Sequence, residues 1–237
     1  KISENTFEGN IYKKIYELIT SHFDEIESAK PDVSKNSAGY YLWNVYNNTN
    51  GNFDLCRLIV GSQGTLGIVT KINFRVVPTD KYSNLLAVFM PDIKRLSNVV
   101  TEIVPFKPDS LETYDDYSMK LAVKFFFDFF KSLGFWGAIK LGLKFIPEAW
   151  MIVTNGVPKL ILLVEVTGQD QADVKNQLLA IQSKIQHFGY KMHIAKDQGE
   201  ADKYWRIRRE SFNMLRKHVH GQRTAPFIDD IIVKPEY

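Results

Sequence analysis

Residues 160–195 read LILLVEVTGQDQADVKNQLLAIQSKIQHFGYKMHIA and contain the clearest secondary-structure pattern of the chain. Its first part, 160–166, is a continuous apolar run that Gly168 closes, which predicts a buried strand. Residues 190–195 predict a second strand. Between them the apolar residues recur every three or four positions, which predicts a helix with the stripe Val174, Leu178, Ile181, Ile185 and Phe188.

The same alternation of strands and helices continues on both sides of this stretch. Upstream, 85–90 predict a strand, an apolar stripe from Asp92 to Ile103 predicts a helix, and 110–114 predict another strand. Downstream we expect a helix over 200–218 and a strand over 227–233. This order predicts an α+β fold in which helices pack on one face of a largely antiparallel sheet.

The N-terminal part has a different pattern. Apolar residues between Ile11 and Ile26 predict a helix that ends before Pro31. Two strands, one around Leu58 and one over 68–76, are expected to flank a glycine-rich turn. A polar linker at 78–84 then separates two domains, 1–80 and 81–237, and the second carries an aromatic-rich insertion at about 117–150.

The composition of the 237 residues is that of an ordinary globular protein, with 45% hydrophobic and 24% charged residues. It excludes a disordered chain, a collagen and a disulfide scaffold. The net charge of +3 is spread along the chain and gives no support for nucleic-acid binding. The single cysteine, Cys56, lies in an apolar run, so we expect a buried free thiol and a reducing compartment. Lys1 stands where a complete chain would begin with Met, and both ends read as breaks within a longer protein.

The glycine-rich turn is the first candidate site. Gly61, Gly64 and Gly67 fall at every third position, where backbone N–H groups can form a nest that suits a pyrophosphate. The pattern is neither a Walker loop nor a Rossmann fingerprint, because no Gly-Lys-Ser/Thr follows and the next element reads as a strand. Spacing alone leaves a second interpretation open, a hairpin that binds no ligand.

An arginine interrupts the apolar face of the last predicted helix. Arg208 falls in the middle of a stripe formed by Ala201, Trp205, Phe212 and Leu215. A guanidinium in that place needs either an acidic partner, such as Asp229 or Asp230, or a cleft in which it can hold a carboxylate. The periodicity leaves both interpretations open.

The insertion is rich in aromatic residues and carries stripes of lysine. It contains no stretch of about 18 charge-free apolar residues, so it does not predict a membrane span. Residues 121–150 suit either a hairpin that lies on an anionic membrane surface or a helical pair packed against protein. The histidines complete no metal set, because His218 and His220 lie on different helix faces. The others, His22, His187 and His193, are expected at the surface or satisfied by neighbours.

Two motifs carry a resemblance to a known family. KNSAGYYL (35–42) and LIVGSQGTLGIVT (58–70) resemble the end of the PCMH-type FAD-binding domain in FAD-linked oxidases of the vanillyl-alcohol oxidase type, in particular the glycolate oxidase and D-lactate dehydrogenase flavoproteins. The resemblance implies main-chain contacts to FAD from Gln63, Gly64, Thr65, Leu66, Gly67, Ile68 and Val69. Many members have Glu where this chain has Gln63.

A third motif, YWRIRRESF (204–212), is similar to the arginine helix of the cap domain in the same family. The resemblance implies that Arg208 binds the carboxylate of a 2-hydroxy acid and that Arg206 and Arg209 lie on the polar side. The implied fold is the C-terminal part of the FAD-binding domain followed by a ferredoxin-like cap domain with an antiparallel sheet.

The resemblance implies an FAD-dependent enzyme that oxidises D-lactate, glycolate or a similar 2-hydroxy acid by hydride transfer to the flavin. No catalytic residue is assigned in this sequence; the family's histidine is expected beyond its end, so the chain alone should not turn over and should bind FAD poorly. The alternatives are an FAD enzyme of the alkylglycerone phosphate synthase type and a non-catalytic module that contacts a membrane or a subunit. The expected partners are the hydroxy acid, an unidentified electron acceptor and a second copy of the chain; nucleic acid is not expected. The expected location is the cytoplasm, with peripheral contact to the inner membrane face.

Overall fold

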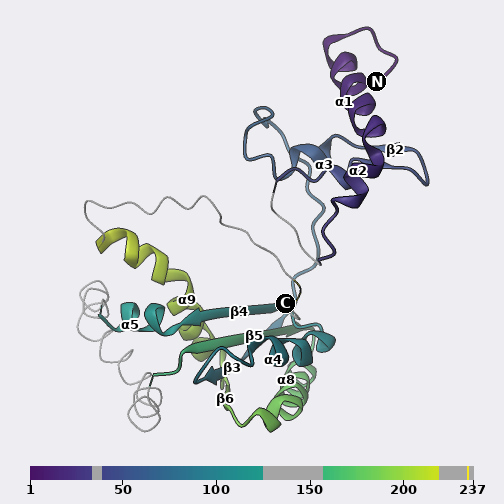
Figure 1. The fold of residues 1–237 in the computed structure, drawn as a ribbon. Helices are drawn as coiled ribbons and strands as arrows, with labels where there is room; N and C mark the ends of the chain where they lie inside the picture. Colours follow the sequence, from purple (N-terminus) through teal and green to yellow (C-terminus); the bar gives the residue numbers. More distant parts are fainter. Residues whose placement is uncertain (34–38, 125–156, 219–233, 235–237) are drawn as a thin grey trace. The chain divides into compact units, whose positions relative to one another are not determined.

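The computed structural model describes residues 1–33, 39–124, 157–218 and 234 (Figure 1). The chain divides into two compact units, with the boundary between Val76 and Val77. Each unit has its own buried apolar residues.

The N-terminal unit begins with two helices, α1 (Phe7–Ser21) and α2 (Phe23–Ser28). The Thr6 hydroxyl caps α1 by accepting a hydrogen bond from the Gly9 N–H. The single helix predicted from Ile11 to Ile26 is therefore two helices that meet at His22. A short helical turn (Leu42–Asn44) and a small hairpin of β1 (Tyr46–Asn47) and β2 (Asn52–Phe53) follow. The buried residues of this unit are Ile19, Val45, Leu55 and Leu58.

The strand predicted around Leu58 is wrong, because this segment forms the short helix α3 (Cys56–Ile59). Asp54 Oδ1 accepts a hydrogen bond from the Cys56 N–H, and Leu55 and Leu58 are buried one helical turn apart. That arrangement turns Cys56 outward, so the prediction of a buried thiol is also wrong.

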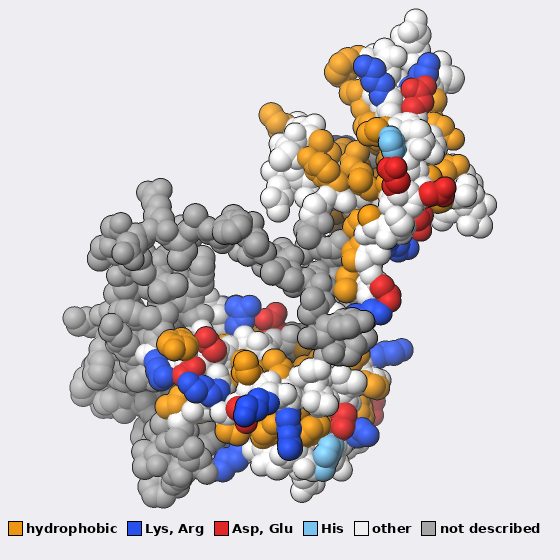
Figure 2. Space-filling view, viewed as in Figure 1, with side chains coloured by type: hydrophobic (Ala, Val, Ile, Leu, Met, Phe, Trp, Pro, Cys, Tyr) orange, Lys and Arg blue, Asp and Glu red, His pale blue; other side chains and the backbone are white. Residues whose placement is uncertain are grey.

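The second predicted strand, 68–76, is also wrong. These residues have no strand assignment, and within the described part of the chain they form no ladder of backbone hydrogen bonds. Ile68, Phe74 and Val76 are 94%, 79% and 88% exposed. Figure 2 shows hydrophobic side chains on the visible face of this unit. A one-sided apolar pattern becomes a strand only where a neighbouring strand accepts its hydrogen bonds.

The C-terminal unit is built on a four-stranded antiparallel sheet. Its elements are β3 (Tyr82–Met90), α4 (Leu96–Ile103), β4 (Ser110–Asp115), α5 (Asp116–Lys124), β5 (Leu160–Gly168), α8 (Gln171–Ile185), β6 (Lys191–Ile194) and α9 (Gln198–His218). The strand order is β4-β5-β3-β6, and every neighbouring pair is antiparallel. Setting aside α5 and α9, this is the βαββαβ order of a ferredoxin-like fold, as predicted.

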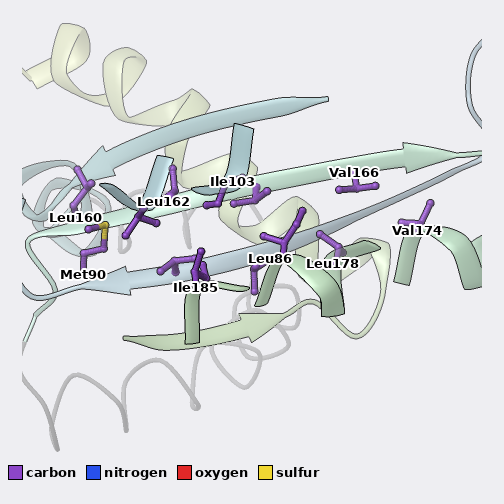
Figure 3. Close-up of a cluster of buried hydrophobic side chains, with 13 residues drawn as sticks. Leu86, Met90, Ile103, Leu160, Leu162, Val166, Val174, Leu178 and Ile185 are labelled. Atoms are coloured by element: carbon purple, nitrogen blue, oxygen red, sulfur yellow. The ribbon is translucent and has the colours of Figure 1, made fainter. Parts of the chain in front are cut away.

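Both faces of the sheet are covered, whereas we expected helices on one face only. Even-numbered residues of β3 and β5, such as Leu86 and Leu162, pack against α4 and α8 (Figure 3). Odd-numbered residues, such as Ala87 and Leu163, form a second cluster with α5 and α9 on the other side (Figure 1). The reason is visible in β5, whose run is apolar at consecutive positions rather than at alternate ones, as in strands buried on both faces.

Aspartates stand at the start of α8 and α9. Asp170 caps α8 through bonds from the Ala172 and Asp173 N–H groups. At α9, Asp197 Oδ1 accepts a hydrogen bond from the Glu200 N–H, and Glu200 Oε2 accepts one from the Lys196 N–H. These reciprocal bonds fix the start of the helix that carries Arg208.

Candidate functional site

The glycine-rich turn lies in the N-terminal unit, directly after α3. Gln63 and Gly64 have positive φ angles of 52° and 77°, and the Thr65 N–H donates to the Ser62 carbonyl at 3.0 Å. Positive φ at both central residues is the signature of a type I′ turn. The turn that the glycine spacing predicts is therefore present, although helix α3 and an extended segment flank it in place of two strands.

Hydrogen bonds from the side chains of Thr65 and Tyr40 stabilise this turn. Ser62 is buried, and its carbonyl also accepts a 2.6 Å hydrogen bond from the Thr65 hydroxyl. The Tyr40 hydroxyl lies 2.8 Å from the same Thr65 oxygen. Tyr40 belongs to the other motif that resembles the FAD-binding domain, 35–42, so the two motifs meet in space at Thr65.

The outer side of the turn is open. A Cβ added at Gly61, Gly64 or Gly67 would meet no atom within 4 Å. Within the described residues, no hydrogen bond uses the N–H groups of Gln63, Gly64 or Leu66. The seven predicted cofactor residues, 63–69, thus form one continuous exposed backbone segment. Exposed amides beside open space fit the main-chain binding of a pyrophosphate such as that of FAD.

Arg208, the predicted substrate residue, lies on α9 in the C-terminal unit. It follows buried Tyr204 by one helical turn and therefore points to the same face of the sheet. Its Nε and Nη2 atoms each lie 3.1 Å from Glu112 Oε2 on β4. The Arg208 side chain is 44% exposed, and that of Glu112 is 40% exposed. The ion pair is therefore open to solvent on one side.

This pair forms part of the wall of an open cleft of about 570 Å³. The residues around it come from β4, β5 and α9 and are Glu112, Glu165, Gln198, Asp202, Trp205, Arg208 and Arg209. Glu165 is fixed by a 2.7 Å hydrogen bond from the Ser83 hydroxyl. The described residues of the cleft combine the Trp205 ring with charges of both signs, a lining that suits a small polar ligand better than an apolar one.

A second polar group lies near the start of α9. His193 Nε2 is 3.1 Å from Glu200 Oε1, and the buried Lys203 Nζ is 3.9 Å from the same oxygen. Burial tends to raise the pKa of Glu200, but the Lys196 N–H and the His193 ring outweigh it and hold the pKa below its ordinary value. The expectation that a neighbour satisfies His193 is met only in part, because its Nε2 lies within ion-pair distance of Glu200 but makes no hydrogen bond within the described residues.

Sequence reasoning missed the acidic residues of the cleft. It considered Asp229 and Asp230 as partners of Arg208, and these residues lie outside the described part of the chain. Glu112 is 96 positions away from Arg208 in sequence. The alternation of side chains along β4 could have indicated this contact. Glu112 lies two residues before Tyr114 and therefore lies on the same face of the sheet. Arg206 and Arg209 are exposed, as predicted.

The insertion and the predicted strand 227–233 lie largely or wholly outside the described residues. Of the helices that are described, none is long and apolar enough to cross a membrane. In the same ranges no three His, Cys, Asp or Glu side chains are grouped as metal ligands would be.

Comparison with known proteins gives matches to flavoproteins. The model of the C-terminal domain of FAD linked oxidases matches residues 79–237. The D-2-hydroxyglutarate dehydrogenase of Pseudomonas putida is 26% identical over 236 residues, which cover 96% of this chain and 22% of that protein. The Escherichia coli enzyme of the same name is 22% identical over 242 residues, 98% of this chain and 22% of that protein.

A further match is short and lies at higher identity. The glycolate oxidase subunit GlcD of Bacillus subtilis is 38% identical over 65 residues, 27% of this chain and 14% of that protein. The chain therefore spans about a fifth of the length of the dehydrogenases that it matches.

Proposed function

Because the chain belongs to the family of FAD linked oxidases, whose C-terminal domain matches residues 79–237, we propose that it is part of an enzyme that oxidises 2-hydroxy acids. The observation that carries this proposal is the half-exposed guanidinium of Arg208 in the wall of a polar cleft, on the helix that the family resemblance marks. A planar guanidinium that solvent can reach is the group that best recognises a carboxylate.

The residues would divide the work between the two units. The amides of 63–69 hold the pyrophosphate of FAD, and Arg208 binds and orients the substrate carboxylate. Bound FAD supplies the hydride acceptor for the α-carbon of the hydroxy acid. Trp205 and the cleft walls limit the space around the substrate, so the cleft selects small acids.

D-2-hydroxyglutarate is the first substrate to test, because it is the one that four relatives are named for. D-lactate and glycolate are the comparison substrates. The test is anaerobic bleaching of the oxidised flavin in the full-length protein that contains this chain. Bleaching by none of these acids would contradict the proposal and favour the alternatives, a synthase without net oxidation or a non-catalytic module.

Arg208→Ala tests the substrate role directly. We expect KM for the hydroxy acid to rise about a hundredfold, because a charge-assisted pair of hydrogen bonds is lost. Arg209→Ala is the matched control, since Arg209 lines the same cleft but carries no assigned contact to the carboxylate. If Arg208→Ala keeps the KM of the wild type, Arg208 does not bind the carboxylate.

We also propose a cytoplasmic protein that contacts the inner membrane face through residues 121–150. The support is the sequence pattern of aromatic residues and lysine stripes. Co-sedimentation with vesicles that contain phosphatidylglycerol should occur at low salt and be absent with phosphatidylcholine alone. Equal sedimentation with both vesicles, or with neither, would favour packing of this segment against protein, including a second copy of the chain.

A further inference from the structure

Glu112 is the acidic residue that contacts Arg208 from within the sheet. Both contacts, from Nε and from Nη2, reach the same carboxylate oxygen, Oε2. They occupy the Nε–Nη2 edge of the guanidinium. The Arg208 side chain is nevertheless 44% exposed, so solvent and a carboxylate ligand can still reach it beside Glu112.

From this geometry we propose that Glu112 is a positioning residue, which holds Arg208 in the orientation that binds the substrate carboxylate. The inference rests on the proposed function. An arginine side chain has many rotamers, and it loses that freedom when it binds a ligand. Glu112 lies on β4, which is held in place by its ladder with β5. A carboxylate fixed in this way restricts the rotamers of Arg208 before the substrate binds, so less conformational entropy is lost on binding.

The charge of the cleft makes this role testable. Among the described residues that line the cleft, three are acidic, Glu112, Glu165 and Asp202, and two are basic, Arg208 and Arg209. An anionic substrate is repelled by each of these carboxylates. If charge alone mattered, removal of any one of them would tighten substrate binding. If Glu112 orients Arg208, its removal has the opposite effect.

The experiment compares Glu112→Gln with Glu165→Gln in the full-length flavoprotein. Each change removes one negative charge from the same cleft with little change in shape, and of these two glutamates it is Glu112 whose contact with Arg208 the structure shows. We expect Glu112→Gln to raise KM for the hydroxy acid about tenfold with kcat nearly unchanged. Glu165→Gln should leave KM unchanged or lower it. A lowered KM in both variants would overturn the inference.

Two further variants separate positioning from a general effect on the fold. Glu112→Asp keeps the charge but shortens the reach, so it should also raise KM, whereas a role of charge alone predicts no change. In an Arg208→Ala background, Glu112→Gln should have no further effect on KM, because the residue through which it acts is missing. Additive effects of the two changes would contradict the inference.

Ligand binding at Arg208 can also be measured without enzymatic turnover. Such a measurement tests the role of Glu112 separately from the proposed reaction. A dicarbonyl reagent modifies accessible arginines, and peptide mass spectrometry follows its reaction at Arg208. Oxalate should protect Arg208 in the wild-type holoprotein, and Glu112→Gln should need about tenfold more oxalate for half protection. An unchanged requirement would overturn the positioning role.

The outcomes of the two assays then separate the claims. Protection that weakens in Glu112→Gln, in a protein whose flavin no hydroxy acid reduces, would support the positioning role and refute the proposed reaction. If oxalate gives no protection in the wild type, both Arg208 as the carboxylate site and Glu112 as its positioning residue are refuted.

Discussion

Gly64 and Gly67 form a matched pair within the turn that we assign to FAD. At both positions an added Cβ meets open space, but only Gly64 has a positive φ, of 77°. We expect Gly64→Ala to lower the free energy of unfolding by about 1–2 kcal/mol, because an L residue in the left-handed region is strained. Gly67→Ala should change it by less than about 0.5 kcal/mol. Urea unfolding of the two variants checks both values, and equal stability would contradict the prediction.

The Gly67→Ala variant also tests whether FAD binds at this turn. Because Gly67→Ala is expected to leave the fold intact, a loss of FAD affinity in that variant would come from a methyl group that blocks the approach of the cofactor. Titration of the full-length apoprotein with FAD, followed by flavin fluorescence, measures this loss. Unchanged affinity would place the cofactor elsewhere on the turn.

Asp116 is a second residue whose environment predicts a measurable effect. Its side chain is 6% exposed, and its Oδ2 lies 2.6 Å from Lys120 Nζ and 3.2 Å from Lys159 Nζ. The hydrogen bond from Lys120 is the main cause that holds the pKa of Asp116 below its ordinary value of 3.8. The folded state therefore favours the ionised carboxylate, and this contribution is lost as the pH falls below that value.

We accordingly expect Asp116→Asn to have a lower Tm than the wild type at neutral pH. The difference should shrink as the pH falls through 3.8 toward the lower pKa of the folded state. Thermal unfolding of both proteins over this pH range checks the trend. A difference in Tm that does not depend on pH would show that the charge of Asp116 does not contribute.

Helix α8 allows a comparison between adjacent positions at the scale of an element. Leu178 is fully buried against the sheet, whereas Leu179 is 44% exposed. We expect Leu178→Ala to destabilise the protein by about 2–5 kcal/mol through the cavity that it leaves, and Leu179→Ala by less than about 0.5 kcal/mol. Urea unfolding compares the two variants. Similar losses would mean that α8 packs with a different face toward the sheet.

The elements also show where sequence reasoning succeeds. Periodicity predicted β3, β5 and α8 because each buries its own apolar residues in a pattern that is local to the sequence. It failed at 68–76 because a strand depends on a partner, which no local pattern supplies. It missed the pairing of Glu112 with Arg208 because that contact depends on how α9 crosses β4, 96 residues away.

At the scale of the whole molecule, the connection between the two units is the most accessible part of the described chain. Every residue from Gln63 to Tyr82 is exposed, including Lys71, Arg75 and Lys81. We expect limited trypsin digestion of the 237-residue chain to cut first at these three sites. Mass spectrometry of the first products tests this, and early cleavage at Lys175 or Lys184 within α8 would contradict it.

Asp116 directly follows β4, and Lys159 directly precedes β5. The Asp116 N–H donates to the Lys159 carbonyl, and the side chains of the same two residues form an ion pair. These two contacts hold together the ends of the sequence that connects β4 to β5. The entropic cost of closing a loop rises only slowly with the length of the loop. Evolution can thus lengthen, shorten or exchange the sequence between these two residues while the register of the sheet stays the same, which makes this position a natural point for relatives to diverge.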